Sequence, residues 1–381
     1  MTDHEPADPV RVLRDLIGIE TGRDCLDHVA GVLPGVEHAD DSSLVLRIPG
    51  RGAAQPLLVH GTASDKHGLA MMLAALLRLD ARGERPSGDV MLAVVADGKH
   101  GAKHLVDEHT DLFTGIRCAI GRHAGADIRL PGVGFHPIVV AEKRACLVRV
   151  TIDGADGDAA LLAPSDSPVA QLGMLLTALS GARLARRRTP VVERMLDALA
   201  AALPDDGLSA AVHRLGTDHA NDRVPASLPL SQALFLDSLM RNTANPVAVR
   251  TEAAAGRTPG RVSADIDCRL LPGGGTDAFL AELRTFTGSA EVEVLHEDPV
   301  SEAKPEFGPF YDRLVEVLTK ADPEGVPLPV LTLGSTEAVH YSRLGIRCYG
   351  WLPLHLSEGS LSHRALRFGA DRMTELLRDF P

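Results

Sequence analysis

Hydrophobic positions in the first hundred residues alternate between short continuous runs and a helical pattern. The runs at Ser43–Ile48, Pro56–His60 and Asp89–Ala96 have the length of strands, and the last is typical of a buried parallel strand. Gly68–Leu79 is apolar almost all round, as expected for a helix packed against a sheet. The Pro- and Gly-rich segment Pro49–Gly52 predicts a turn. This alternation predicts a doubly wound α/β domain with a mostly parallel sheet.

A second set of patterns occupies the middle of the chain. Expected strands at Leu147–Ile152 and Val262–Leu271 flank helical patterns at Pro168–Leu179, Pro190–Leu203 and Asp277–Thr287. We therefore expect an α+β lid domain, residues 145–295, inserted into a catalytic-type domain made of residues 1–144 and 296–381. The remaining helical patterns lie at Val10–Ile19, Leu26–Leu33, Phe310–Ala321 and Ala365–Phe380.

Composition narrows the class of protein. The chain has 381 residues, enough for two domains, and a formal net charge of −12, which argues against nucleic acid and anionic membrane surfaces as partners. No apolar run approaches the roughly 18 residues of a membrane-spanning helix, and the first residues do not form a signal peptide. Five dispersed cysteines without paired metal-binding spacing indicate free thiols in the reducing cytoplasm.

Four stretches carry a family resemblance. Residues 61–76 read G-T-A-S-D-K-H-G-L-A-M-M-L-A-A-L, and residues 88–106 read G-D-V-M-L-A-V-V-A-D-G-K-H-G-A-K-H-L-V. Residues 139–150 and 264–273 match strands that lead into and out of a lid, and residues 331–354 contain G-S-T-E-A and L-G-I. In this order, the stretches resemble the aminoacylase/acetylornithine deacetylase/carboxypeptidase-G family of dizinc peptidases, which implies that family's two-domain fold.

The resemblance implies a metal site whose residues are changed here. In the family, two zinc ions share a bridging carboxylate, and a glutamate takes a proton from metal-bound water. The bridging acid falls on Ser64, the catalytic glutamate on Gly98, the neighbouring ligand on Lys99 and the third acid on Arg122. The lid histidine that stabilises the oxyanion falls on Asp158. We therefore predict that dizinc hydrolysis is lost and that no metal ion or other cofactor is bound.

Two histidines keep a weaker relation to the family site. His355 matches the last zinc ligand, whereas His60 lies too close to Ser64 for the family's spacing. A mononuclear site built from His60, Asp65 and His355 stays open as an alternative.

The substitutions also change the charge of the expected pocket. Lys99 and Arg122 stand where acids bind zinc in the family, so the pocket would favour a carboxylate, phosphate or sulfate group. The alternative is a stable core without a ligand, in which Lys99 pairs with Asp97 and Arg122 with Asp65.

Three functions follow, in order of preference. The first is a metal-independent enzyme acting on an anionic, N-acylated or amide-linked amino acid by cyclisation, elimination or acyl transfer, a role that suits specialised metabolism. The candidate acid–base residues are His355, Asp65 and Lys99. The candidate substrate-binding residues are Arg122, Ser64, His60 and Glu337.

The other two functions use different parts of the chain. A non-catalytic partner subunit would pair with itself or with an active homologue through the lid, as a homodimer or heterodimer. A serine hydrolase would use Ser64 with His67 or His355, although no nucleophile-elbow motif supports it.

Overall fold

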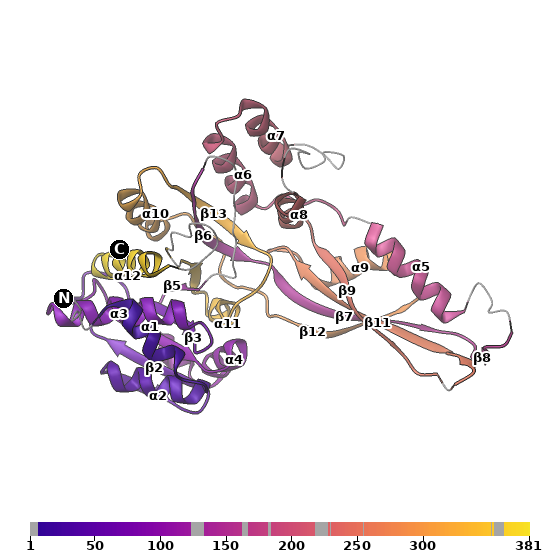
Figure 1. The fold of residues 1–381 in the computed structure, drawn as a ribbon, viewed down its shortest axis with the longest axis horizontal. Coiled ribbons are helices and arrows are strands. Elements are labelled where there is room, and N and C mark those ends of the chain that lie inside the picture. The colour runs from indigo at the N-terminus through magenta and orange to yellow at the C-terminus, as the bar shows by residue number, and fades with distance from the viewer. Residues whose placement is uncertain are drawn as a thin grey trace.

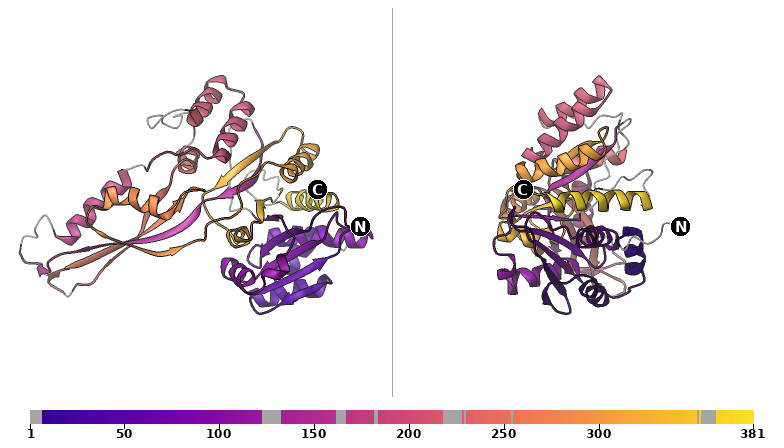
Figure 2. Two further views of the ribbon diagram at one scale, coloured as in Figure 1. Left: turned by 180° about the vertical axis from the view of Figure 1, so that it is seen from behind. Right: turned by 90° about the vertical axis from the view of Figure 1, so that its left-hand side faces the viewer.

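The structure, a computed structural model, describes residues 7–122, 133–161, 167–181, 184–217, 228, 230–253, 255–351, 353 and 362–381. A body containing both termini carries an elongated lid that extends away from it (Figures 1 and 2). No helix in these ranges combines the length and apolar character needed to cross a membrane. The five cysteines are free, three of them buried and two partly exposed.

The body is built on an eight-stranded sheet with the strand order β1-β2-β4-β3-β5-β14-β6-β13. Its strands are β1 (Val36–Ala39), β2 (Ser43–Ile48), β3 (Leu57–Thr62), β4 (Val90–Val95), β5 (Cys118–Gly121), β6 (Phe135–Glu142), β13 (Val326–Thr332) and β14 (Arg347–Gly350). The central strands β4, β3, β5 and β14 run parallel, while β2 is antiparallel to β4 and β6 to β14. The prediction of a doubly wound, mostly parallel sheet is confirmed.

Helices cover both faces of this sheet because alternate strand residues point to opposite sides. Leu57 and Val59 face one core, whereas Leu58 faces the other. The larger core contains α1 (Pro9–Ile17), α2 (Gly22–Val32), α3 (Lys66–Ala81), α10 (Pro309–Ala321) and α12 (His363–Arg378). The smaller core contains α4 (Gly98–Glu108), the short helices η1 (Thr110–Phe113) and α11 (Ala338–Tyr341), and borders η2 (Ser342–Leu344).

The lid is a four-stranded antiparallel sheet with its own hydrophobic core. Its strand order is β12-β7-β11-β9. The strands are β7 (Arg144–Asp153), β9 (Thr243–Thr251), β11 (Arg261–Leu270) and β12 (Glu291–Glu297). Helices α5 (Pro168–Gly181) and α9 (Thr276–Thr287) pack on it, and β8 (Gly157–Asp158) pairs with β10 (Arg257–Thr258) near its far end (Figure 1).

Part of the inserted segment packs with the body rather than with the lid sheet. Helices α6 (Pro190–Ala202), α7 (Asp206–Thr217) and α8 (Leu230–Leu239) contribute to the larger core, and α6 packs against β13. The helices α6, α7 and α8 therefore belong to the body by packing, although they lie within the segment predicted to form the lid.

Candidate functional site

The site lies where parallel strands of the body end. Ser64 and Asp65 follow β3, Lys99 follows β4, and Arg122 follows β5 directly. Because these three strands are parallel neighbours, their carboxyl ends lie at one edge of the sheet. The structure thus brings these segments to one edge of the sheet.

Lys99 in the first turn of α4 is held by a buried acid from the base of the lid. Its Nζ donates to both carboxylate oxygens of Asp298, at 2.9 and 2.8 Å, and to Ser335 Oγ at 2.6 Å. Asp298 is 2% exposed and also accepts the backbone N–H of Ala145 at 3.0 Å. The suggested pairing with Asp97 is wrong, because the Asp97 side chain is 82% exposed and lies 3.5 Å from His100.

The charge of Lys99 is therefore matched within the protein. Burial works to raise the pKa of Asp298, but the hydrogen bonds from Lys99 and Ser335 outweigh it, and the pKa lies below its ordinary value. Asp298 is consequently ionised at neutral pH. The pocket does not carry the uncompensated positive charge that the sequence predicted at Lys99.

His60 lies inside the sheet rather than at an open surface. Its Nδ1 is 3.1 Å from Glu337 Oε1, and the two side chains are 1% and 3% exposed. Its Nε2 is buried without a hydrogen-bond partner among the described atoms. A Cβ on Gly121 would come within 2.1 Å of the imidazole, so only glycine fits beside this ring. His60 thus acts as a core residue anchored to Glu337.

Glu142, at the end of β6, supplies a second, partly buried carboxyl near Glu337. It accepts hydrogen bonds from Thr336 N at 2.8 Å and Thr336 Oγ1 at 2.7 Å. Burial raises the pKa of Glu142, and the negative charge of Glu337 adds to this rise. Glu337 shifts the other way, because the hydrogen bond from His60 and the charges of His60 and Arg122 lower its pKa against the effect of burial. The pKa values of these two neighbouring carboxyls are therefore shifted in opposite directions.

One tripeptide connects these groups. Ser335 contacts Lys99, Thr336 contacts Glu142, and Glu337 contacts His60. Lys99, Glu142 and His60 are thereby brought into one polar network, while Arg122 acts on Glu337 through its charge. His355 lies outside the described residues.

The remaining expected residues have local roles. Asp65 caps α3 by accepting the Gly68 N–H at 3.1 Å. Ser64 is exposed, and its hydroxyl lies 2.7 Å from that of Thr62.

Two residues at the junction of body and lid were missed by the sequence reasoning. One is Glu142, and the other is its neighbour Lys143, which is fully buried and donates to the Ser238 carbonyl at 2.9 Å. Burial lowers the pKa of Lys143 to about 7. The signal was available, since a Glu-Lys pair directly follows the apolar run of β6 and precedes that of β7.

Ser64, Gly98, Lys99 and Arg122 occupy the positions that the resemblance assigns to the acids, and the Lys99 ammonium is fixed there. Throughout the part of the chain that the structure describes, ligand atoms of three His, Cys, Asp or Glu residues converge in one place only. That place is His38, Asp40 and His109, beyond the opposite end of α4.

Comparisons with known proteins agree with the fold. A metallo-carboxypeptidase of the M20 family from Sulfolobus solfataricus superposes with a TM-score of 0.67 at 15% identity, covering 97% of this chain and 98% of that chain. The aminopeptidase PepT from Bacillus cereus gives 0.63 at 11% identity, with 97% of each chain covered. The YXEP protein from Bacillus subtilis, a dinuclear metal-binding peptidase of the M20 family, gives 0.61 at 12% identity, again with 97% of each chain covered.

Identities this low establish a shared fold and nothing about substrate. No curated protein sequence matches the chain. The model of peptidase family M20/M25/M40, however, matches residues 59–368, which span both the body and the lid. The chain therefore belongs to peptidase family M20/M25/M40.

Proposed function

We propose that this chain has lost the metal-dependent hydrolysis of its family and acts without a metal on an anionic, N-acylated or amide-linked amino acid derivative. The observation that carries the first half is the bridge from Lys99 to Asp298 and Ser335, at a position that the resemblance assigns to a zinc-binding acid. A fixed ammonium a few ångströms from a dication is strongly unfavourable. Under this proposal the bridge takes the place of the metal.

The anionic character of the substrate rests on Arg122. Of the two cations Lys99 and Arg122, Lys99 is neutralised by Asp298, so Arg122 is the one that would recognise a substrate carboxylate. A guanidinium can hold a carboxylate through two parallel hydrogen bonds. Arg122 is partly exposed at the carboxyl end of β5, and its charge already acts on Glu337. The pair Glu142 and Glu337 would then fix the segment that faces the substrate.

The reaction class follows from the candidate acid–base groups. Asp65, at the same edge as Lys99, and His355, a candidate from the sequence alone, are the proposed proton-transfer residues, with the fixed Lys99 ammonium as a proton donor or electrostatic stabiliser. Cyclisation, elimination and acyl transfer need such groups and no metal-bound water. We also propose a cytoplasmic location, with which five free cysteines agree.

The exposed apolar edge of the lid favours a second candidate, a non-catalytic subunit that binds a partner through the lid. Strand β9 lies at the edge of the lid sheet, and its Val247 and Val249 are 59% and 58% exposed. Helix α5 packs beside β9 and exposes Met174 and Val169. Apolar side chains grouped on an open strand edge are typical of a pairing surface. Analytical ultracentrifugation of wild type and Val249→Lys tests this candidate, which predicts a dimer that the lysine dissociates.

The proposed enzyme is tested with a panel of N-acyl amino acids and dipeptides. Wild-type protein should show ligand-dependent thermal shifts, and mass spectrometry should detect a product whose formation neither a chelator nor added zinc changes. Arg122→Gln should abolish both effects. Arg117→Gln is the matched control, because Arg117 is exposed at the opposite end of β5.

Two outcomes would contradict the proposal. Zinc-stimulated dipeptide hydrolysis that is lost on chelation would restore the family's chemistry. A protein that binds none of the ligands and forms no product, yet dimerises through β9, would favour the partner subunit instead.

A further inference from the structure

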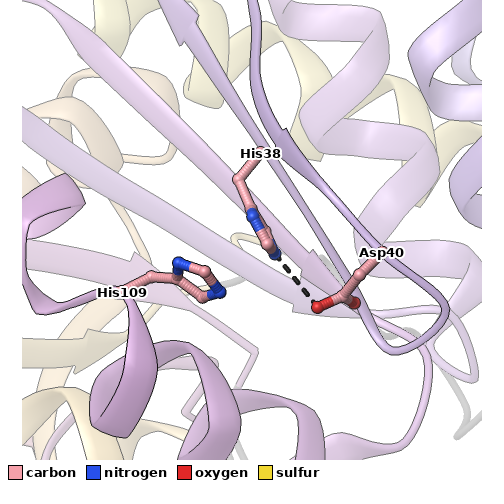
Figure 3. A group of neighbouring side chains, drawn as sticks. All are labelled: His38, Asp40 and His109. Atoms are coloured by element: carbon pink, nitrogen blue, oxygen red, sulfur yellow. Dashed lines mark hydrogen bonds and ion pairs between the residues drawn. The ribbon is translucent and has the colours of Figure 1, made fainter.

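Four side chains converge at the end of α4 opposite Lys99. His38 lies on β1 and Asp40 directly follows it, while His104 lies in the C-terminal half of α4 and His109 caps that helix. One ligand atom from each of His38, Asp40 and His109 lies within 4.8 Å of the others. Figure 3 shows the two imidazoles approaching the carboxylate from the strand side and the helix side.

Asp40 is held in a fixed orientation by the turn between β1 and β2. Its Oδ1 accepts the backbone N–H groups of Ser42 and Ser43, both at 2.7 Å, and their hydroxyls at 2.9 and 3.0 Å. The other oxygen, Oδ2, lies 3.1 Å from the Nε2 atoms of both His38 and His104. Oδ1 is thus hydrogen-bonded within the turn, whereas Oδ2 faces the histidines.

The spacing suits a tetrahedral ion with nitrogen and oxygen ligands. For bonds of about 2.0–2.1 Å, neighbouring ligand atoms of a tetrahedral zinc ion lie about 3.3 Å apart. The contacts of Oδ2 with His38 and His104 are already near that value. The ligand atoms of His38, Asp40 and His109 lie within 4.8 Å of one another, so side-chain adjustments of up to about 1.5 Å bring His109 to this spacing.

The surrounding charges favour a cation. Arg23 is the basic side chain whose charge couples to Asp40, and it is paired with Asp27 and Asp41. Lys103, on the same helix as His104, is paired with Asp107. The C-terminal end of α4 adds the negative pole of the helix dipole.

We propose that His38, Asp40, His104 and His109 form a site for a divalent transition metal of the zinc class, which joins the edge strand β1 to α4. Three imidazoles and one carboxylate are donors that such ions prefer, whereas calcium and magnesium require oxygen ligands. The site lies about 15 Å along α4 from Lys99. It is therefore separate from the family pocket, and it does not depend on the proposed function.

Calorimetry with zinc chloride on the metal-stripped full chain tests the site. Wild type should bind one equivalent, and His38→Ala and His109→Ala should each weaken binding at least ~10-fold. His100→Ala is the matched control, because its side chain lies on the same helix, is 88% exposed and is outside the cluster. Zinc should also raise the Tm by about 2–5 °C in wild type and in His100→Ala, but not in His38→Ala.

Cobalt(II) supplies a readout of geometry. A tetrahedral site gives cobalt an intense visible absorption, which His109→Ala should abolish while circular dichroism shows that the variant stays folded. Wild type that binds no zinc, or binding unchanged in both histidine variants, overturns the inference and leaves the proposed function intact. Zinc binding that survives His38→Ala but is lost in Glu337→Gln places the ion in the family pocket and contradicts both.

Discussion

Removing the Lys99 ammonium is the sharpest perturbation that the structure offers. In Lys99→Met, the Asp298 carboxylate, 2% exposed in the wild type, keeps the Ser335 hydroxyl and the Ala145 N–H as hydrogen-bond donors, with His296 Nε2 at 3.5 Å. Breaking a buried pair from one side costs about 3–5 kcal/mol. The Lys99 side chain is 32% exposed, so solvent already screens part of the attraction, and we expect a loss of ~2–3 kcal/mol in the free energy of unfolding.

The pH dependence gives this loss a sign. In wild type the pKa of Asp298 is lowered, so the stability it contributes is present above the ordinary value of 3.8 and is lost as the pH falls. Without Lys99, burial dominates and raises that pKa, so the variant loses stability as the pH rises through the new value. The two proteins should therefore differ most at neutral pH and converge in acid.

Urea denaturation of Lys99→Met, Asp298→Asn and the double variant measures the interaction directly. We expect a coupling energy of about 1.5–3 kcal/mol at neutral pH. Lys103→Met is the matched control, since Lys103 lies on the same helix with a 60% exposed side chain paired to Asp107, and it should change stability by less than ~0.5 kcal/mol. A coupling energy below ~0.5 kcal/mol, or a Lys99→Met variant as stable as this control, would refute the reasoning.

Three further predictions concern the rest of the network. Arg122→Glu should weaken the binding of an anionic ligand by at least ~3 kcal/mol, about a hundredfold in affinity. Thermal shifts measured against ligand concentration test this, and an unchanged affinity would show that Arg122 does not bind the ligand. Gly121→Ala should lower the free energy of unfolding by about 2–3 kcal/mol, because the new Cβ meets the imidazole of His60. Most of this loss should vanish in a His60→Ala background, and urea denaturation of wild type, the two single variants and the double variant measures it. Burial raises the pKa of Glu142 above its ordinary value of 4.5, so the protein loses stability as the pH rises from 4.5 through the raised value. Glu142→Gln should flatten this decline, which urea denaturation across pH measures, and an unchanged decline would assign it to another group.

The elements with strong local patterns were predictable, and the short ones were not. The run Ser43–Ile48 coincides with β2, and the pattern Gly68–Leu79 lies within α3 (Lys66–Ala81). Strands β5 and β14 have only four residues each, too few for a period to be distinguished from chance. These two strands nevertheless pair with each other, and Arg122 directly follows β5.

The site could be predicted only as far as local patterns reach. Strand ends placed Lys99 and Arg122 at one edge, but their acidic neighbours come from distant segments, and Asp298 lies 199 residues from Lys99. Periodicity along a chain carries no information about such a pairing. The predicted pairing of Lys99 with Asp97 was wrong for the same reason, since a residue that is near in sequence at the start of a helix can point into solvent.

The bridge between Lys99 and Asp298 also constrains the evolutionary routes open to this chain. A glutamate at position 99 would place a second carboxylate against an acid that is 2% exposed, and a neutral residue at position 298 would leave the ammonium without its partner. The two positions are therefore epistatic, and a change at either one alone gives a less stable protein. An acid at position 99 is tolerated only together with a second change at position 298, 199 residues away in the sequence.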